Sequence, residues 1–267
     1  MLDKQSSWND IQPRAKRALR DIRGRFNQLY RSSDGREGWG QYLNPPTHRN
    51  HTGIYGTGSG VQVLSTADSE IINEQIKSGQ NWLIHQWSQD DSETKRSGYN
   101  FLTYKYAFCL FGLSPHDTVF LSGRQQYDNQ YDDTVDEFFE GLWERRIGTN
   151  GWAKYCLEEA ESLEPDLQSS AFAALSLLGS QKIRNKPDFE EILKSIGERA
   201  YQEGKTIDSR HVGNGTKSVL TISLCLLALS RYKNIKPDNS IQKQTEIYID
   251  RLSDVITSQV GSGNNFD

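Results

Sequence analysis

The sequence predicts an all-α protein built from repeated helical hairpins. Three observations predict this fold class. Amphipathic segments show a helical spacing of apolar residues, segments between them are apolar nearly all round, and glycine-rich loops separate the two kinds. No segment shows the strict alternation or the hairpin turns that favour a sheet. The length of 267 residues fits one large domain or an array that buries its core one repeat at a time.

The first predicted helix covers residues 10–30 and is basic. Residues 1–36 contain nine Lys or Arg against four Asp or Glu, a net charge of +5, whereas the rest of the chain has 22 against 31, a net charge of −9. Such a helix binds nucleic acid or an acidic partner, or it is a solvated face that pairs with the chain's own acidic surface. We favour the solvated face, because charge runs usually solvate a helix. The candidate contacts for nucleic acid are Arg14, Arg17 and Arg20.

The rest of the chain, residues 37–267, is predicted to be an array of hairpins on which the basic helix packs. A glycine-rich stretch at 34–60 is expected to be a long loop, or a loop leading to a helix start. Outer helices, each with one apolar stripe, alternate with inner helices that are apolar on every side and therefore buried. The outer helices are predicted at 69–87, 134–146, 188–201 and 241–258, and the inner ones at 101–113, 169–179 and 217–232.

The loops carry a second, finer pattern. One reads Gly-Trp-Gly-Gln-Tyr at 38–42 and another Gly-Trp-Ala-Lys-Tyr at 151–155, each followed by a polar loop and a helix start rich in small residues. This pattern resembles the α/α-toroid superfamily of squalene-cyclase-like terpenoid cyclases and protein prenyltransferase β subunits, over most of residues 30–258. The resemblance implies a ring of helical hairpins. No inner helix follows 241–258, so either this outer helix caps the array or the chain is part of a longer protein. We favour the second explanation and expect an incomplete ring.

The resemblance also implies catalytic signatures, which this chain lacks in part. The cyclases protonate their substrate with Asp-x-Asp-Asp, but the aligned stretch here, 166–169, keeps only Asp166, which we interpret as a cap of the inner helix. The prenyltransferases bind zinc with Asp, Cys and His. Here Cys156 follows the second Gly-Trp loop without an Asp-x-Cys, and His211 has no matched partner. We therefore predict neither substrate protonation nor a zinc site, and we expect no cofactor.

One acidic motif keeps an enzymatic alternative open. Asp132, Asp133 and Asp136 spell the Asp-Asp-x-x-Asp with which class I terpene synthases bind magnesium and a diphosphate. Acids also gather in a first helical turn because they stabilise its free N–H groups, and this interpretation is favoured since no second magnesium motif follows. The Tyr-Gly-Thr-Gly-Ser-Gly at 55–60 lacks the Lys-Ser/Thr of a phosphate loop, so we interpret it as a tight entry to a helix.

Aromatic residues of one inner helix, Tyr104, Phe108 and Phe111, are candidates for lining an apolar pocket. The resulting hypothesis is a non-catalytic binding or sensing module of a larger protein or complex, which recognises a partner protein or a small apolar or anionic ligand. The alternative is a cyclase- or prenyltransferase-like enzyme that uses Mg²⁺. No apolar run of 18 residues and no signal core occurs, so we expect a cytoplasmic protein without a membrane span.

Overall fold

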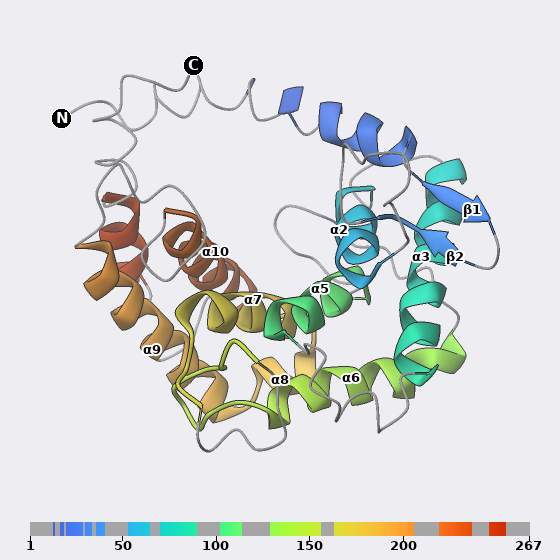
Figure 1. Ribbon diagram of the computed structural model, residues 1–267. Helices are drawn as coiled ribbons and strands as arrows, with labels where there is room; N and C mark the ends of the chain where they lie inside the picture. The colour runs from blue at the N-terminus through green and yellow to red at the C-terminus, as the bar shows by residue number, and fades with distance from the viewer. Residues whose placement is uncertain are drawn as a thin grey trace. The chain divides into compact units, whose positions relative to one another are not determined.

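The computed structural model describes the helices and several of the loops between them. The described residues are 13, 17–18, 20–28, 30–33, 36–40, 53–64, 70–89, 102–113, 129–155, 163–205, 219–236 and 246–254. They are mostly helical, which confirms the predicted all-α class (Figure 1). The chain divides into two compact units. Unit 1 comprises Met1–Gln89 and Phe111–Tyr131, and unit 2 comprises Asp90–Leu110 and Asp132–Asp267.

Unit 1 begins with the basic helix, described over residues 20–28, and a short hairpin. Strands β1 (Arg31–Ser33) and β2 (Arg36–Gly38) pair antiparallel. This hairpin corrects the expectation that no segment favours a sheet. Its signal in the sequence is the Asp-Gly dipeptide at 34–35, a pair of residues strongly preferred in two-residue hairpin turns. Strands of three residues are too short to be stable alone, and β2 packs against the helices that follow.

The last part of the glycine-rich stretch is helical, which corrects the expectation that residues 55–60 form only a tight entry to a helix. Helix α2 (Ile54–Leu64) includes all of residues 55–60, and it packs against α3 (Glu70–Gln89). The reason is the fully buried Trp39, whose indole lies against one face of α2. A Cβ added at Gly60 would stand 2.5 Å from the Trp39 ring, and one at Gly56 only 2.2 Å from the Gly40 carbonyl oxygen. Glycine is a poor helix former, but here it opens the slot that Trp39 occupies.

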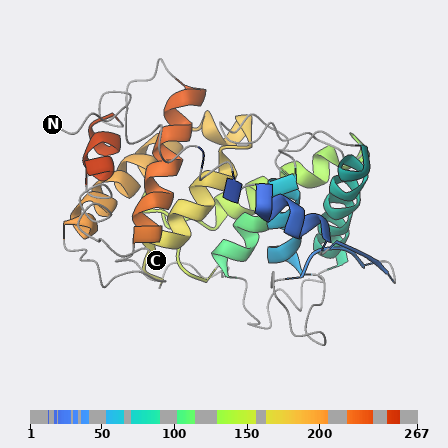
Figure 2. The same cartoon turned by 90° about the horizontal axis from the view of Figure 1, so that it is seen from above.

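Unit 2 contains the remaining hairpins, and their helices lie close to the predicted positions. The inner helices are α5 (Thr103–Leu113), α7 (Leu167–Leu177) and α10 (Val219–Ile235), and the outer ones are α6 (Asp132–Glu144), α9 (Pro187–Gly204) and a helix at 246–254. The last three residues of α5 belong to unit 1, as does a short 3-10 turn, η1 (Asn129–Tyr131), and a one-turn helix α8 (Gln181–Arg184) precedes α9. Helices α7, α9 and α10 pack against one another, as both views show (Figures 1 and 2).

The structure thus shows helices packed in pairs, such as α2 with α3 and α9 with α10. The closure of the pairs into a toroid stays a prediction. The boundary predicted at residue 36 falls inside unit 1, where Phe26 of the basic helix packs edge-on against Trp39 with ring centroids 6.5 Å apart. None of the helices that the structure describes is both long and apolar enough to cross a membrane.

Candidate functional site

The Gly-Trp loop of unit 2 joins the beginnings of two inner helices. Its backbone forms antiparallel bridges between Tyr155 and Leu102, just before α5, and between Ala153 and Pro165, just before α7. Trp152 in the same loop is fully buried, and its indole Nε1–H donates a 2.7 Å hydrogen bond to the Leu142 carbonyl near the end of α6. One loop thus holds an outer helix and two inner helices together.

Buried hydroxyl groups complete this joint. The Ser170 hydroxyl of α7 accepts a 2.9 Å hydrogen bond from the Trp152 backbone N–H, and it lies 3.2 Å from the Trp152 carbonyl oxygen. The Thr103 hydroxyl of α5 donates a 2.6 Å bond to the Ala153 carbonyl. Gly151 has a φ of +105°, and a Cβ there would stand 2.3 Å from the Ser170 Oγ. Glycine at this position therefore meets both a conformational and a steric requirement.

The same joint occurs in unit 1 with different residues. The Thr57 hydroxyl accepts a 3.2 Å bond from the Trp39 backbone N–H, and the Trp39 indole donates a 2.7 Å bond to the Phe26 carbonyl. In both units the hydroxyl follows the tryptophan by 18 residues. In both, the residue just before the helix (Gly53 before α2, Asp166 before α7) donates its backbone N–H to the tryptophan carbonyl. We call this arrangement the Trp–hydroxyl joint.

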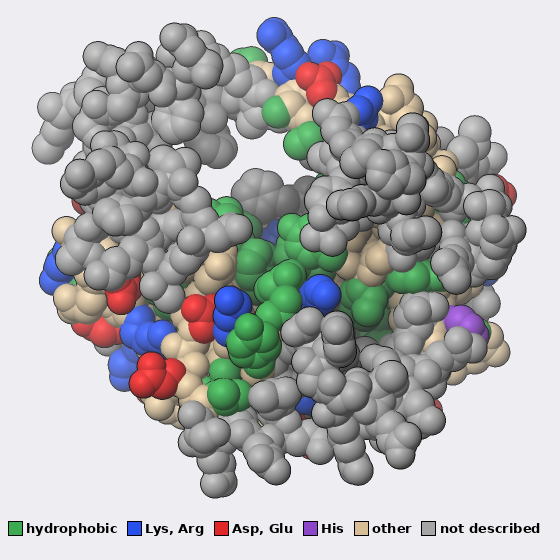
Figure 3. Space-filling model, viewed as in Figure 1, with side chains coloured by type: hydrophobic (Ala, Val, Ile, Leu, Met, Phe, Trp, Pro, Cys, Tyr) green, Lys and Arg blue, Asp and Glu red, His purple; other side chains and the backbone are tan. Residues whose placement is uncertain are grey.

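The inner helices of unit 2 keep one side partly exposed, and this side is the candidate site. On α5, Tyr104 and Phe108 are half-buried, and the Phe108 ring lies 5.2 Å, centroid to centroid, from that of Phe172 on α7. On α10 the partly exposed positions include Leu224 and Leu227, and Leu220 is 46% exposed. The space-filling view shows hydrophobic side chains gathered over α5 and α7 (Figure 3). We call these residues of α5, α7 and α10 the inner face.

The inner face agrees only in part with the predicted pocket residues. Tyr104 and Phe108 belong to it, whereas Phe111 lies in unit 1, where its carbonyl accepts a hydrogen bond from Gln62. Phe172 and the leucines of α10 were missed. They stand in runs that are apolar at nearly every position, so no periodicity in the sequence distinguishes the exposed side of these helices from the buried ones.

The structure assigns Asp166 the role of a helix cap. It is the N-cap of α7, and its carboxylate accepts a 2.8 Å hydrogen bond from the Ser169 backbone N–H. This arrangement confirms the interpretation that the lone carboxylate of the cyclase-like motif caps the inner helix. A carboxylate at this position satisfies a free N–H group and interacts favourably with the helix dipole.

The acidic motif stands at the beginning of α6. Asp132 and Asp133 lie in its first turn, and both are exposed, as is Asp136. The arginines at the other end of this helix interact with their neighbours. Arg145 donates a 2.8 Å bond to the Gly141 carbonyl, and Arg146 forms a 3.0 Å ion pair with Asp188. No group of three potential metal ligands occurs among the described side chains.

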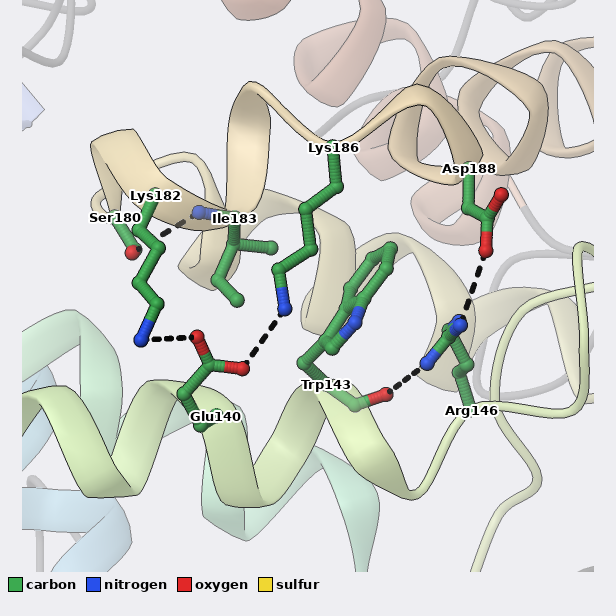
Figure 4. A network of polar contacts seen from close by, with 8 residues as sticks. All are labelled: Glu140, Trp143, Arg146, Ser180, Lys182, Ile183, Lys186 and Asp188. Carbon is green, nitrogen blue, oxygen red and sulfur yellow. Dashed lines mark hydrogen bonds and ion pairs between the residues drawn. The ribbon is translucent and has the colours of Figure 1, made fainter.

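A polar network joins α6 to the segment that leads into α9 (Figure 4). The Glu140 carboxylate forms ion pairs with Lys182, at 3.0 Å, and with Lys186, at 2.9 Å. Partial burial acts to raise the pKa of Glu140, but hydrogen bonds from Lys186 and Lys182 outweigh it and lower that pKa. The buried Trp143 ring carries Arg146 on one side, 4.1 Å from the ring centroid, and Lys186 5.1 Å away. These charged groups stabilise the packing of α6 against α8 and the beginning of α9.

The two described cysteines are buried thiols. Burial raises the pKa of both Cys109 and Cys225 to about 12. Thiols that remain protonated in an apolar setting are poor nucleophiles and poor metal ligands. Cys156 and His211, the other residues considered for zinc, lie outside the described residues.

No family model, curated protein or solved structure matches this chain. The resemblance to α/α-toroid proteins therefore stays a prediction, and the function has to be argued from the chain's own residues.

Proposed function

We propose that the chain is a non-catalytic binding module whose inner face receives a small apolar or anionic ligand or an apolar part of a partner protein. The observation that carries the proposal is the exposure of leucine on α10. A helix enclosed by its neighbours would bury Leu220, Leu224 and Leu227, yet Leu220 is 46% exposed and the other two are only partly buried. Exposed apolar surface of this kind marks binding surfaces.

The polar residues support the same proposal. Asp166 is used as a cap, and the arginines near the end of α6 are bonded to Gly141 and Asp188. Protonation of a substrate would need a free carboxylic acid, and diphosphate binding would need free cationic groups. Because these described groups interact with the protein itself, we assign recognition of another molecule to the inner face.

The enzymatic alternative rests on the exposed carboxylates of α6. Asp132, Asp133 and Asp136 are exposed near the beginning of α6, and Mg²⁺ prefers carboxylate oxygens. Diphosphate binding also needs cationic groups nearby. Arg145 lies 13 residues from Asp132, which by helix rise is about 20 Å. The alternative therefore needs cations from elsewhere, and we retain it as the competing outcome of the experiment.

The experiment measures binding of the fluorescent apolar anion anilinonaphthalene sulfonate to the full chain. We expect saturable binding, and a severalfold loss of affinity in the double variant Leu220→Gln/Leu224→Gln, because polar groups at these positions no longer favour an apolar ligand. The matched control is Ile247→Gln, which removes an apolar side chain of similar exposure, 47%, from the helix at 246–254. The control should bind the probe like the unmodified protein.

Two results would count against the proposal. Equal probe binding by the double variant and the control would place the site elsewhere. A rise in melting temperature with Mg²⁺ and geranyl diphosphate, abolished by Asp133→Ala, would favour the enzyme, since a ligand that binds the folded state stabilises it by mass action.

A further inference from the structure

The helices of unit 2 differ in the sign of their charges. The inner helices α5, α7 and α10 contain no Asp or Glu, and their charged residues are Lys105, Arg231 and Lys233. The outer helix α6 carries six acids and no Lys or Arg, and α9 carries five acids against two bases. Among these helices, carboxylates therefore occur only in the outer ones. A surface lined by charges of one sign attracts ligands of the opposite sign.

Lys105 is the cation that adjoins the apolar residues of the inner face. It precedes Phe108 by three residues on α5, and residues three apart are neighbours on the surface of a helix. Its side chain is half-buried, and its ammonium group has no hydrogen-bond or ion-pair partner among the described residues of unit 2. Lys233, by contrast, is paired with Glu246 at 2.9 Å, and Arg231 is buried. Lys105 is therefore the charge that a ligand on the inner face can meet.

Gln168 occupies the corresponding position on α7. It precedes Phe172 by one turn, as Lys105 precedes Phe108, and the two phenylalanine rings lie 5.2 Å apart between centroids. The Gly-Trp loop bridges the segments just before both helices, so α5 and α7 begin at the same end of the inner face. The Gln168 amide is half-buried and makes no hydrogen bond with a residue that the structure describes. The inner face thus has polar donors at one end and apolar side chains beyond them.

We propose that the inner face binds a long-chain carboxylate, with its anionic head at Lys105 and Gln168 and its chain over the apolar residues. This inference rests on the proposed function, because it names the class of ligand for the same face. The ammonium and amide groups both donate hydrogen bonds, which a carboxylate accepts. Asp166 does not neutralise Lys105, since its carboxylate caps α7 and forms no ion pair with that lysine. One available cation matches one negative charge, whereas a diphosphate would need several cations.

The size of the inner face favours a small molecule over a protein. A specific protein interface takes about 20–30 residues from each side. The apolar residues that the structure places on the inner face of α5, α7 and α10 are far fewer. A single alkyl chain is suited to so narrow an apolar surface, because each methylene group that leaves water adds to its affinity.

The test compares ligands that share one alkyl chain and differ in the charge of the head: dodecanoate, dodecanol and dodecyltrimethylammonium. Isothermal titration calorimetry measures their binding to the full chain, below the concentrations at which they form micelles. We expect dodecanoate to bind about tenfold more tightly than dodecanol, the contribution of one charge-assisted hydrogen bond, and the cationic ligand to bind most weakly. Lys105→Gln should reduce the affinity for dodecanoate to that for dodecanol, whereas Lys105→Arg, which keeps the charge, should retain the preference.

The matched control is Lys194→Gln, which removes one charge from the outer helix α9 and should keep the preference for dodecanoate. Equal affinity of the unmodified protein for dodecanoate and dodecanol would overturn the inference, as would a preference that survives Lys105→Gln. Tighter binding of geranyl diphosphate than of dodecanoate would also overturn it and identify a diphosphate as the ligand.

The uncharged ligand tests the proposed function separately from this inference. Dodecanol binding that weakens in Leu220→Gln/Leu224→Gln supports the apolar inner face whatever the head-group comparison gives. Absence of binding by all of these ligands would contradict both the inner face as a binding site and the carboxylate as its ligand.

Discussion

The substitution Gly60→Ala tests whether glycine in α2 is required by the packing of Trp39. In an exposed helix interior, alanine is more favourable than glycine by about 0.5–1 kcal/mol. At position 60, however, the new Cβ would stand 2.5 Å from the Trp39 ring. The ring cannot move away easily, because it is buried and its indole is bonded to the Phe26 carbonyl. Overpacking of this kind costs about 1–3 kcal/mol, so we expect a net destabilisation of up to about 2 kcal/mol.

The matched control is Gly24→Ala in the basic helix of the same unit. An added Cβ meets nothing within 4 Å there, so only the helix propensity acts, and the variant should be more stable by up to about 1 kcal/mol. Urea denaturation followed by circular dichroism at 222 nm measures both changes. Opposite signs for the same chemical substitution are the expected result. If Gly60→Ala stabilises the protein as Gly24→Ala does, Trp39 does not occupy this slot and the account of α2 is wrong.

Three further predictions concern unit 2. Ser170→Ala should lower the free energy of unfolding, measured by urea titration, by about 1–3 kcal/mol, because the buried Trp152 N–H loses its acceptor. The control Ser176→Ala removes only a hydrogen bond within its own helix and should lower the free energy of unfolding by less. Glu140→Gln should lower the free energy of unfolding by at most about 1 kcal/mol at neutral pH. Because the folded-state pKa of Glu140 lies below the ordinary 4.5, the difference in unfolding free energy between the variant and the unmodified protein should shrink as the pH falls below 4.5. A difference that does not depend on pH would contradict the ion pairs. Cys109 and Cys225 should resist iodoacetamide at pH 8 until the protein is denatured, as mass spectrometry can measure, and rapid labelling of the native protein would contradict their burial.

The helices that the sequence predicted best are those with a clear period. Helix α9 was expected at 188–201 and covers Pro187–Gly204, since its apolar stripe recurs at helical spacing and Pro187 suits the first turn. Helix α2 was missed because Gly56, Gly58 and Gly60 are poor helix formers by local preference. The slot for Trp39 is a tertiary requirement, set by residues outside the helix, and it overrides that preference.

The candidate site was predictable only where a residue acts locally. The role of Asp166 follows from its place immediately before an apolar run, so sequence reasoning could identify the cap. The inner face depends instead on which side of α10 remains open. Leu220 and the buried Leu229 are indistinguishable in a run of this composition, and only the packing of α7 and α9 against α10 separates them.

The Trp–hydroxyl joint explains how two hairpins of so little shared sequence can fold alike. What recurs is a tryptophan, a hydrogen-bonded backbone N–H 14 residues later and a hydroxyl 18 residues later. The hydroxyl is threonine in α2 and serine in α7, and the residue before the helix is Gly53 in one and Asp166 in the other. Each pair supplies the same bonds, because a backbone N–H and a hydroxyl oxygen do not depend on the rest of the side chain. The inner helices α5 and α10 also bury a hydroxyl near their start, at Thr103 and Thr221. The recurring positions lie at the start of each helix and not on its exposed side, so that side can differ from one repeat to the next.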